Sequence, residues 1–147
     1  MNTPTTFVIL LAEDESADAH LVKVAISENR ILADLHIVAD GREALEFLRC
    51  QGTHYANAPR PDLILLDLNM PRMDGREFFS VIKQDATLKD IPVVVLTTSD
   101  VERDIVASYH LGAAGYVTKP WTSINSWKRS DNLASIGLRL VRLPRQI

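Results

Sequence analysis

Acidic side chains follow two apolar runs of this sequence. Glu13 and Asp14 come directly after the run 7–12, and Asp67 ends the most apolar segment of the chain, PDLILLDLNMP. Residues 63–66 are all aliphatic, which is typical of a central strand covered on both faces. If both runs are parallel strands, their carboxyl ends meet at the edge where open α/β sheets bind ligands. A lone Asp at a strand end more often caps a turn, so the interpretation of Asp67 depends on its neighbours.

A hydroxyl and a lysine follow two later apolar runs. Thr97 closes the run that starts at Pro92, and Lys119 comes directly after the run 115–118. Taken singly, each residue has an ordinary explanation, such as an acidic first helical turn, a β-branched strand residue or a surface lysine. Taken together, these explanations require an acid pair, an acid, a hydroxyl and a cation to meet at one sheet edge by accident. We therefore expect the four groups to form one site.

Phosphoryl chemistry accounts for this combination of side chains. Clustered carboxylates repel one another, and protonation or a bound cation relieves the repulsion. A small set of oxygen ligands favours Mg²⁺, which keeps several waters and usually binds one or two carboxylates plus a phosphate. Lysine and threonine suit the remaining oxygens of that phosphate. Because carboxylates form acyl phosphates, the pattern predicts Mg²⁺-assisted, in-line phosphoryl transfer onto Asp67.

The elements that must position these residues alternate along the chain. Hydrophobic periodicity, caps and breakers predict strands at 7–12, 35–39, 63–67, 92–97 and 115–118. They predict helices at 16–29, from Asp40-Gly41, from Asp74-Gly75, at 99–111 and after Pro120, with a loop at 52–61. Single helices between strands imply right-handed crossovers and a parallel sheet.

Composition is that of a small intracellular domain. The chain has 147 residues, of which 46% are hydrophobic and 24% charged, with a net charge of -3, so no basic surface indicates nucleic acid or a membrane. Cys50 is the single cysteine, which excludes an internal disulfide and favours a reducing compartment. The start MNTPTT lacks signal-peptide character, and no apolar run reaches membrane-spanning length. We expect one cytoplasmic domain.

The motifs at the strand ends resemble those of a known family. LLAEDE, LLDLNMPRMDG, VVVLTTS and GYVTKP, in this order, are similar to the receiver domain of two-component response regulators over about residues 6 to 120. The resemblance implies an α/β, flavodoxin-like (βα)5 fold, doubly wound around a five-stranded parallel sheet. It also implies a phosphoacceptor signalling protein rather than an enzyme, with Asp67 as the phosphoacceptor.

The resemblance assigns roles to the other site residues. Mg²⁺, or Mn²⁺ in its place, is expected to bind Asp14 and Asp67 directly, Asn69 through its backbone carbonyl and Glu13 through water. The resemblance makes Thr97 the switch hydroxyl and Lys119 the residue that pairs with the phosphate. It makes Tyr116 an aromatic switch, although a half-buried strand tyrosine is the alternative for that position.

The remaining sequence is similar to the stand-alone regulators. The residues after 120 are too few for an output domain, so we expect 1–147 to be a single receiver domain, with a core at about 6–120 and a last helix and tail at 121–147. The loop GTHYANAPRP and the tail VRLP more narrowly resemble regulators partnered with bacterial and cyanobacterial phytochrome histidine kinases. That resemblance implies such a kinase as partner and a homodimer formed through the last helix and tail, without nucleic acid or membrane.

Residues 121–140 depart from the family pattern. Serines and charged residues interrupt the apolar stripe that a last helix needs, and Gly137 adds a helix penalty of about 1 kcal/mol. One hypothesis is a frame-shifted reading, because a one-base shift can give VDFNQFVEAIRQLGEYWLAV, which has the missing stripe. A divergent helix is the other explanation. An unambiguous in-frame read of the gene over this span would rule the shift out.

Two other functions fit part of the pattern. A haloacid-dehalogenase-type phosphatase also uses a strand-end Asp, a Thr and a Lys, but it places the nucleophile on the first strand with a second Asp two residues later, where this chain has Asn69. A degenerate receiver that acts only as a protein-interaction module would usually lose an acid, the hydroxyl or the lysine. None of these is lost here.

Overall fold

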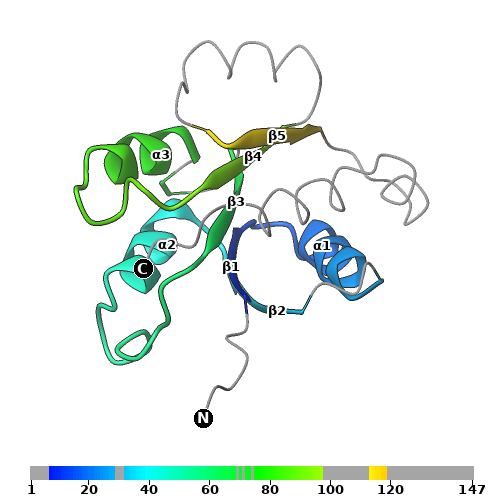
Figure 1. Cartoon of the computed structure of the whole chain (residues 1–147), viewed down its shortest axis with the longest axis horizontal. Coiled ribbons are helices and arrows are strands. Elements are labelled where there is room, and N and C mark those ends of the chain that lie inside the picture. The colour runs from blue at the N-terminus through cyan, green and yellow to red at the C-terminus, as the bar shows by residue number, and fades with distance from the viewer. Residues whose placement is uncertain are drawn as a thin grey trace.

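A five-stranded parallel sheet forms the centre of the computed structural model, which describes residues 7–28, 32–68, 70, 72–73, 75–97 and 113–118. The strands lie in the order β2-β1-β3-β4-β5 (Figure 1). The elements in chain order are β1 Phe7–Ala12, α1 Ser16–Glu28, β2 Ala33–Val38, α2 Gly41–Leu48, β3 Leu63–Asp67, α3 Gly75–Lys83, β4 Val93–Thr97 and β5 Gly115–Thr118. The predicted fold class is confirmed.

The central strand β3 is buried along its whole length, as its composition predicts. It pairs in parallel with β1 on one side and β4 on the other, in registers that include Ala12 with Leu66 and Asp67 with Leu96. Since the strands are parallel, their carboxyl ends share one edge, which we call the carboxyl edge. The residues that lead into the strands share the opposite edge, the amino edge.

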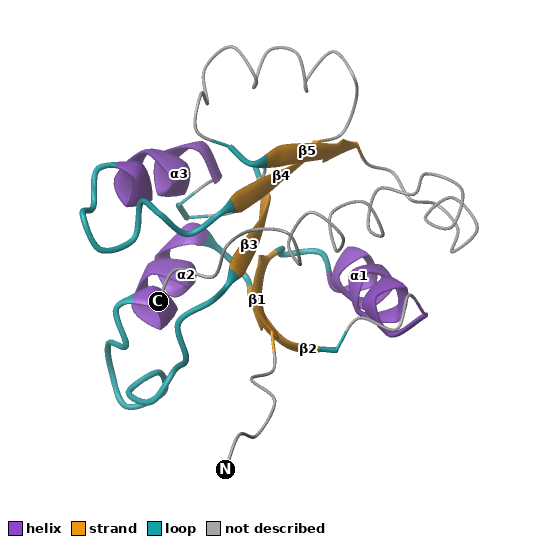
Figure 2. Cartoon of the chain, viewed as in Figure 1, coloured by secondary structure: helices purple, strands orange, loops and turns teal. Residues whose placement is uncertain are grey.

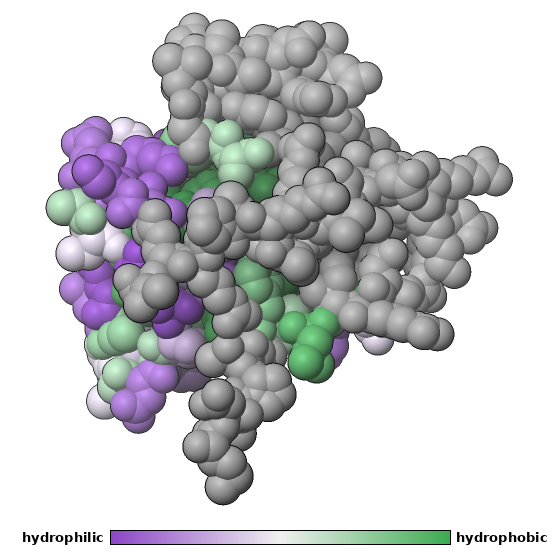
Figure 3. Space-filling model, viewed as in Figure 1, coloured by the Kyte–Doolittle hydropathy of each residue, from purple (hydrophilic) through white to green (hydrophobic). Residues whose placement is uncertain are grey.

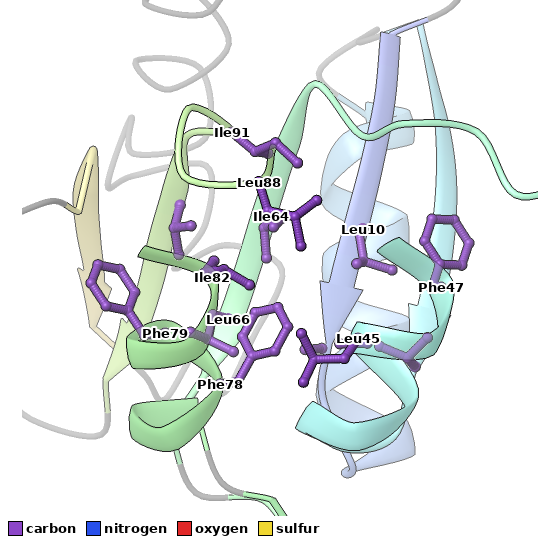
Figure 4. Packing of buried hydrophobic residues seen from close by; sticks show 14 of the residues in the cluster. Leu10, Leu45, Phe47, Ile64, Leu66, Phe78, Phe79, Ile82, Leu88 and Ile91 are labelled. Carbon is purple, nitrogen blue, oxygen red and sulfur yellow. The ribbon is translucent and has the colours of Figure 1, made fainter. Parts of the chain in front are cut away.

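The described helices lie on both faces of the sheet, with α2 and α3 on one face and α1 on the other (Figure 1). Alternate strand residues point to opposite faces. Leu10, Ile64 and Leu66 pack with the inner sides of α2 and α3, and neighbouring strand residues such as Leu11 and Leu65 pack with α1. Figure 4 shows Phe78 and Ile82 of α3, with Leu45 of α2, gathered over the first of these faces. The outer sides of α2 and α3 are mainly hydrophilic (Figure 3).

Differences from the sequence prediction are small within the described residues. β2 begins at Ala33 and ends at Val38, whereas residues 35–39 were predicted, and the first helix is described as far as Glu28. The long loop between α2 and β3 is present (Figure 2). The helices predicted at 99–111 and after Pro120 lie outside the described residues. Among the helices that are described, none is long and apolar enough to cross a membrane.

Candidate metal centre at the carboxyl edge

Three carboxylates meet at the carboxyl edge of the sheet. Glu13 and Asp14 follow β1, and Asp67 is the last residue of the neighbouring strand β3. One carboxylate oxygen from each residue lies within 4.8 Å of the others. Glu13 and Asp67 are each 3% exposed, whereas Asp14 is exposed to solvent. The parallel register of two adjacent strands is what brings residues 13 and 67 together.

The backbone after β1 is held by specific hydrogen bonds. The Glu13 amide donates to the Val38 carbonyl at the end of β2, with an N···O distance of 2.9 Å. The Glu13 side chain in turn accepts from the Glu15 amide at 3.2 Å through Oε1. Both the main chain and the side chain of Glu13 are therefore oriented by neighbouring backbone, and its position does not depend on a ligand.

The chain after Asp67 turns back closely on itself. The Gly75 amide donates to the Leu68 carbonyl at 3.0 Å, which closes the loop between β3 and α3. A Cβ atom on residue 75 would lie 2.6 Å from the Leu68 Cα and would also overlap the Asp67 carbonyl oxygen. Only glycine fits at this close approach, so α3 can begin directly beside the end of β3.

A second buried acid lies at the same edge. Asp40, 1% exposed, precedes α2 and accepts the Glu43 amide at 2.8 Å through Oδ1, as an N-cap does. Its Oδ2 lies 2.9 Å from Nε of Arg72, in the loop after β3. Oδ2 accepts no hydrogen bond among the described residues, so this contact is an ion pair. The start of this helix at Asp40-Gly41 was predicted from the sequence, whereas the contact with Arg72 was not.

The other predicted site residues are described only in part. Thr97 ends β4 and pairs with Thr118 of β5, so its backbone lies at the carboxyl edge, and the backbone of Tyr116 lies within β5. The side chains of Thr97 and Tyr116, and all of Asn69 and Lys119, lie outside the described residues. The structure thus brings together Glu13, Asp14 and Asp67, and the roles of all the predicted site residues stay predictions.

The donor set of the three acids fits a hard divalent cation. All three side chains offer carboxylate oxygens, which Mg²⁺ and Mn²⁺ prefer over softer donors. Gathering three carboxylates within one ion's reach raises their mutual repulsion, and a bound cation would offset it. Exposure of Asp14 leaves solvent access for the waters that Mg²⁺ retains.

Comparison with known proteins gives the class of this protein. The response regulator receiver domain family matches residues 9–127, and the chain belongs to this family. It is 48% identical over 137 residues to the response regulator Rcp1 of Synechocystis sp., covering 93% of this chain and 92% of Rcp1.

Solved structures of related regulators have the same fold. One is the phosphorylated cyanobacterial phytochrome response regulator RcpA, which is 44% identical, with a TM-score of 0.78 and coverage of 91% of this chain and 95% of RcpA. Another is the Mn²⁺-bound form of Rcp1, which is 48% identical, with a TM-score of 0.76 and coverage of 88% and 92%. A phosphorylated form and a metal-bound form therefore occur among proteins similar to this one.

Proposed function

We propose that the chain is a single-domain response regulator that accepts a phosphoryl group on Asp67 from a histidine kinase, with Mg²⁺ or Mn²⁺. One observation carries the proposal. A buried carboxylate ends the central strand, and two further acids lie within 4.8 Å of it at the carboxyl edge. The proposed ligands are Asp14 and Asp67 directly, Asn69 by its backbone carbonyl and Glu13 through water.

The proposed reaction transfers a phosphoryl group from a histidine of the kinase to Asp67. An Asp67 oxygen attacks the phosphorus of the kinase phosphohistidine, an O–P bond forms as the N–P bond breaks, and the imidazole leaves with a proton from solvent. Water later hydrolyses the acyl phosphate, which regenerates the carboxylate and releases phosphate. When bound, the divalent cation supplies positive charge to the phosphoryl oxygens.

The remaining predicted residues complete the switch. Lys119 pairs with the phosphoryl group, Thr97 moves to hydrogen-bond it, and Tyr116 rotates inward after Thr97. The surface altered by these movements is what protein partners recognise. The chain as a whole then acts as a signalling protein and not as an enzyme on small substrates, although it assists its own phosphorylation and dephosphorylation.

The proposed kinase partner is a phytochrome. Support comes from the similarity to RcpA, a phytochrome response regulator, over 91% of this chain. We further propose that residues 1–147 form one receiver domain that acts in the cytoplasm, without nucleic acid or membrane. A homodimer through the last helix and tail belongs to the same proposal.

Labelling with acetyl phosphate and Mg²⁺ tests the phosphorylation proposal. Intact-mass spectrometry should show a gain of one phosphoryl group in the wild type and none in Asp67→Asn. Asp62→Asn, an exposed aspartate at the amino edge, is the control and should label like the wild type. Labelling that persists in Asp67→Asn would refute the proposed site. No labelling, even with a phytochrome kinase, would favour an interaction module, and turnover of many phosphate esters would favour a phosphatase.

A further inference from the structure

We propose that Asp40 and Arg72 are positioning residues for the acidic site. Their ion pair holds the loop that follows Asp67 against the start of α2, and through that loop it sets the site's affinity for a divalent cation. The inference deepens the proposed function and rests on it where phosphoryl transfer is concerned. Neither residue is one of the three clustered acids, so the proposed effect passes through the loop backbone.

Arg72 has a backbone conformation that is unfavourable for its residue type. Its φ is 61°, in the left-handed region that side chains other than glycine, asparagine and aspartate rarely adopt. Strain of this kind persists only where surrounding contacts impose it, and it gathers at functional sites. Arg72 lies five residues after Asp67, within the loop that connects the proposed phosphoacceptor to α3.

Asp40 supplies the contact that holds Arg72. Its two carboxylate oxygens have different partners. Oδ1 accepts a hydrogen bond from the Glu43 amide at 2.8 Å, and Oδ2 lies 2.9 Å from the Arg72 Nε. The carboxylate is buried, whereas the Arg72 side chain is 66% exposed. The cap therefore serves α2, and the ion pair is an additional link between α2 and the loop. Without Arg72, the buried carboxylate would lose its counter-charge.

Backbone contacts next to the ion pair transmit its position to Asp67. The Gly41 amide donates to the Met73 carbonyl at 2.9 Å, and a Cβ atom on residue 41 would lie only 2.8 Å from that oxygen. Two residues later, Gly75 closes the loop on the Leu68 carbonyl, beside Asp67. A displacement of Arg72 would thus move a loop that is packed against α2 on one side and against the end of β3 on the other.

Four substitutions distinguish the effect of the ion pair on metal affinity from the effects of helix capping and of backbone strain. Asp40→Asn keeps an N-cap acceptor but removes the charge, and Arg72→Gly removes the charge while relieving the left-handed strain. Arg72→Ala removes the charge and keeps the strain, and Arg72→Lys keeps the charge. The matched control is Arg49→Ala, which breaks an ion pair between Arg49 and Asp85, 3.7 Å apart, at the amino edge.

The measurement is Mn²⁺ binding to the unphosphorylated chain, from the electron paramagnetic resonance signal of free Mn²⁺. We expect the Mn²⁺ Kd to rise about three- to tenfold in Asp40→Asn, Arg72→Ala and Arg72→Gly, with partial rescue in Arg72→Lys. Arg49→Ala should keep the wild-type Kd. Thermal unfolding in chelator should show Arg72→Gly at least as stable as Arg72→Ala, so that a weaker Kd in both cannot be ascribed to stability.

The outcomes distinguish this inference from the proposed function. Wild-type Kd values in Asp40→Asn and Arg72→Gly would overturn the positioning role even if Asp67 is phosphorylated. A weaker Kd in Arg72→Ala but not in Arg72→Gly would assign the effect to backbone strain and would also overturn it. Altered Mn²⁺ binding in the variants, together with no phosphoryl labelling of the wild type, would refute only the proposed function. A wild type that binds no Mn²⁺ would refute the metal site and the inference together.

Discussion

The charged side chains at the two edges of the sheet are arranged differently. At the carboxyl edge, Glu13, Asp14 and Asp67 bring three like charges within 4.8 Å. At the amino edge, contacts join opposite charges or join a charge to the backbone. Arg49 pairs with Asp85, the Asp62 carboxylate accepts the Val8 amide at 2.8 Å, and Arg60 donates to the Thr87 carbonyl at 2.7 Å.

This difference in charge contacts suggests a different role for each edge. The amino-edge contacts stabilise the entry into the strands and need no ligand. Carboxylates held this close repel one another and a bound cation would offset the repulsion, so we propose that the arrangement of the three acids serves binding rather than stability. Asp40, another buried acid at the carboxyl edge, forms an ion pair with Arg72. Substitutions at the two edges should therefore separate stability from metal binding.

The largest expected effect comes from Gly75→Ala at the carboxyl edge. The added Cβ would overlap backbone atoms of Asp67 and Leu68, which cannot move without shifting β3. We expect the free energy of unfolding to fall by about 3 kcal/mol, measured by urea denaturation. Arg76→Ala, an exposed neighbour in α3, should change it by less than about 0.5 kcal/mol. Equal stability of the two variants would mean that the close approach at Gly75 is wrong.

The next effect should appear in metal binding and not in stability. Asp14→Asn removes an exposed side chain that we propose as a metal ligand, so the Mn²⁺ Kd should rise about tenfold or more. The melting temperature in chelator should stay equal or increase, because one repulsive charge is gone. Asp62→Asn, the amino-edge counterpart, should leave the Kd unchanged. A drop in metal-free stability for Asp14→Asn would contradict the distinction between the edges.

Asp62→Ala should show the reverse pattern. It removes the acceptor for the Val8 amide at the start of β1, and we expect a loss of about 1 kcal/mol in the free energy of unfolding. The Mn²⁺ Kd and the phosphoryl labelling should match the wild type. A higher Mn²⁺ Kd in Asp62→Ala would show that the two edges are coupled, and it would contradict the separation of stability from metal binding.

The smallest effect is a pH dependence in the loop between α2 and β3. Burial, and then the hydrogen bond to Glu43, raise the pKa of Tyr55 from 10.0 to about 12 in the folded chain. Because the folded state holds this proton more tightly, its contribution to stability is complete below pH 10 and is lost as the pH rises through about 12. In Tyr55→Phe, the free energy of unfolding should depend slightly less on pH between 10 and about 12, as measured by urea unfolding at several pH values. An unchanged profile would contradict the assignment.

Sequence patterns predicted the bounds of β2 less well than those of the other strands. β1 and β3 have the predicted bounds, because burial on both faces gives uninterrupted apolar runs. β2 begins two residues earlier than predicted. Its exposed polar residue Asp34 belongs to the strand because it pairs with Val8 of β1, and hydrophobic burial gives no signal at this position. An edge strand of this kind has a weak hydrophobic signal.

The site was predictable where it depends on strand ends, and not where it depends on loop conformation. The meeting of Glu13, Asp14 and Asp67 follows from two parallel strands in adjacent positions. The Asp40–Arg72 pair joins residues from different loops and requires a left-handed arginine, which no local pattern indicates. The Asp40 cap alone had a local signal.

Reductive trapping of the phosphorylated chain tests whether Asp67 is the metal-dependent phosphoacceptor. Borohydride converts an aspartyl phosphate to homoserine, so peptide mapping after treatment with acetyl phosphate, Mg²⁺ and borohydride identifies the phosphorylated residue. We expect homoserine at position 67, and only in protein that received both the donor and the metal. Homoserine at position 14 or 40, or trapping at position 67 that does not require a divalent cation, would contradict this expectation.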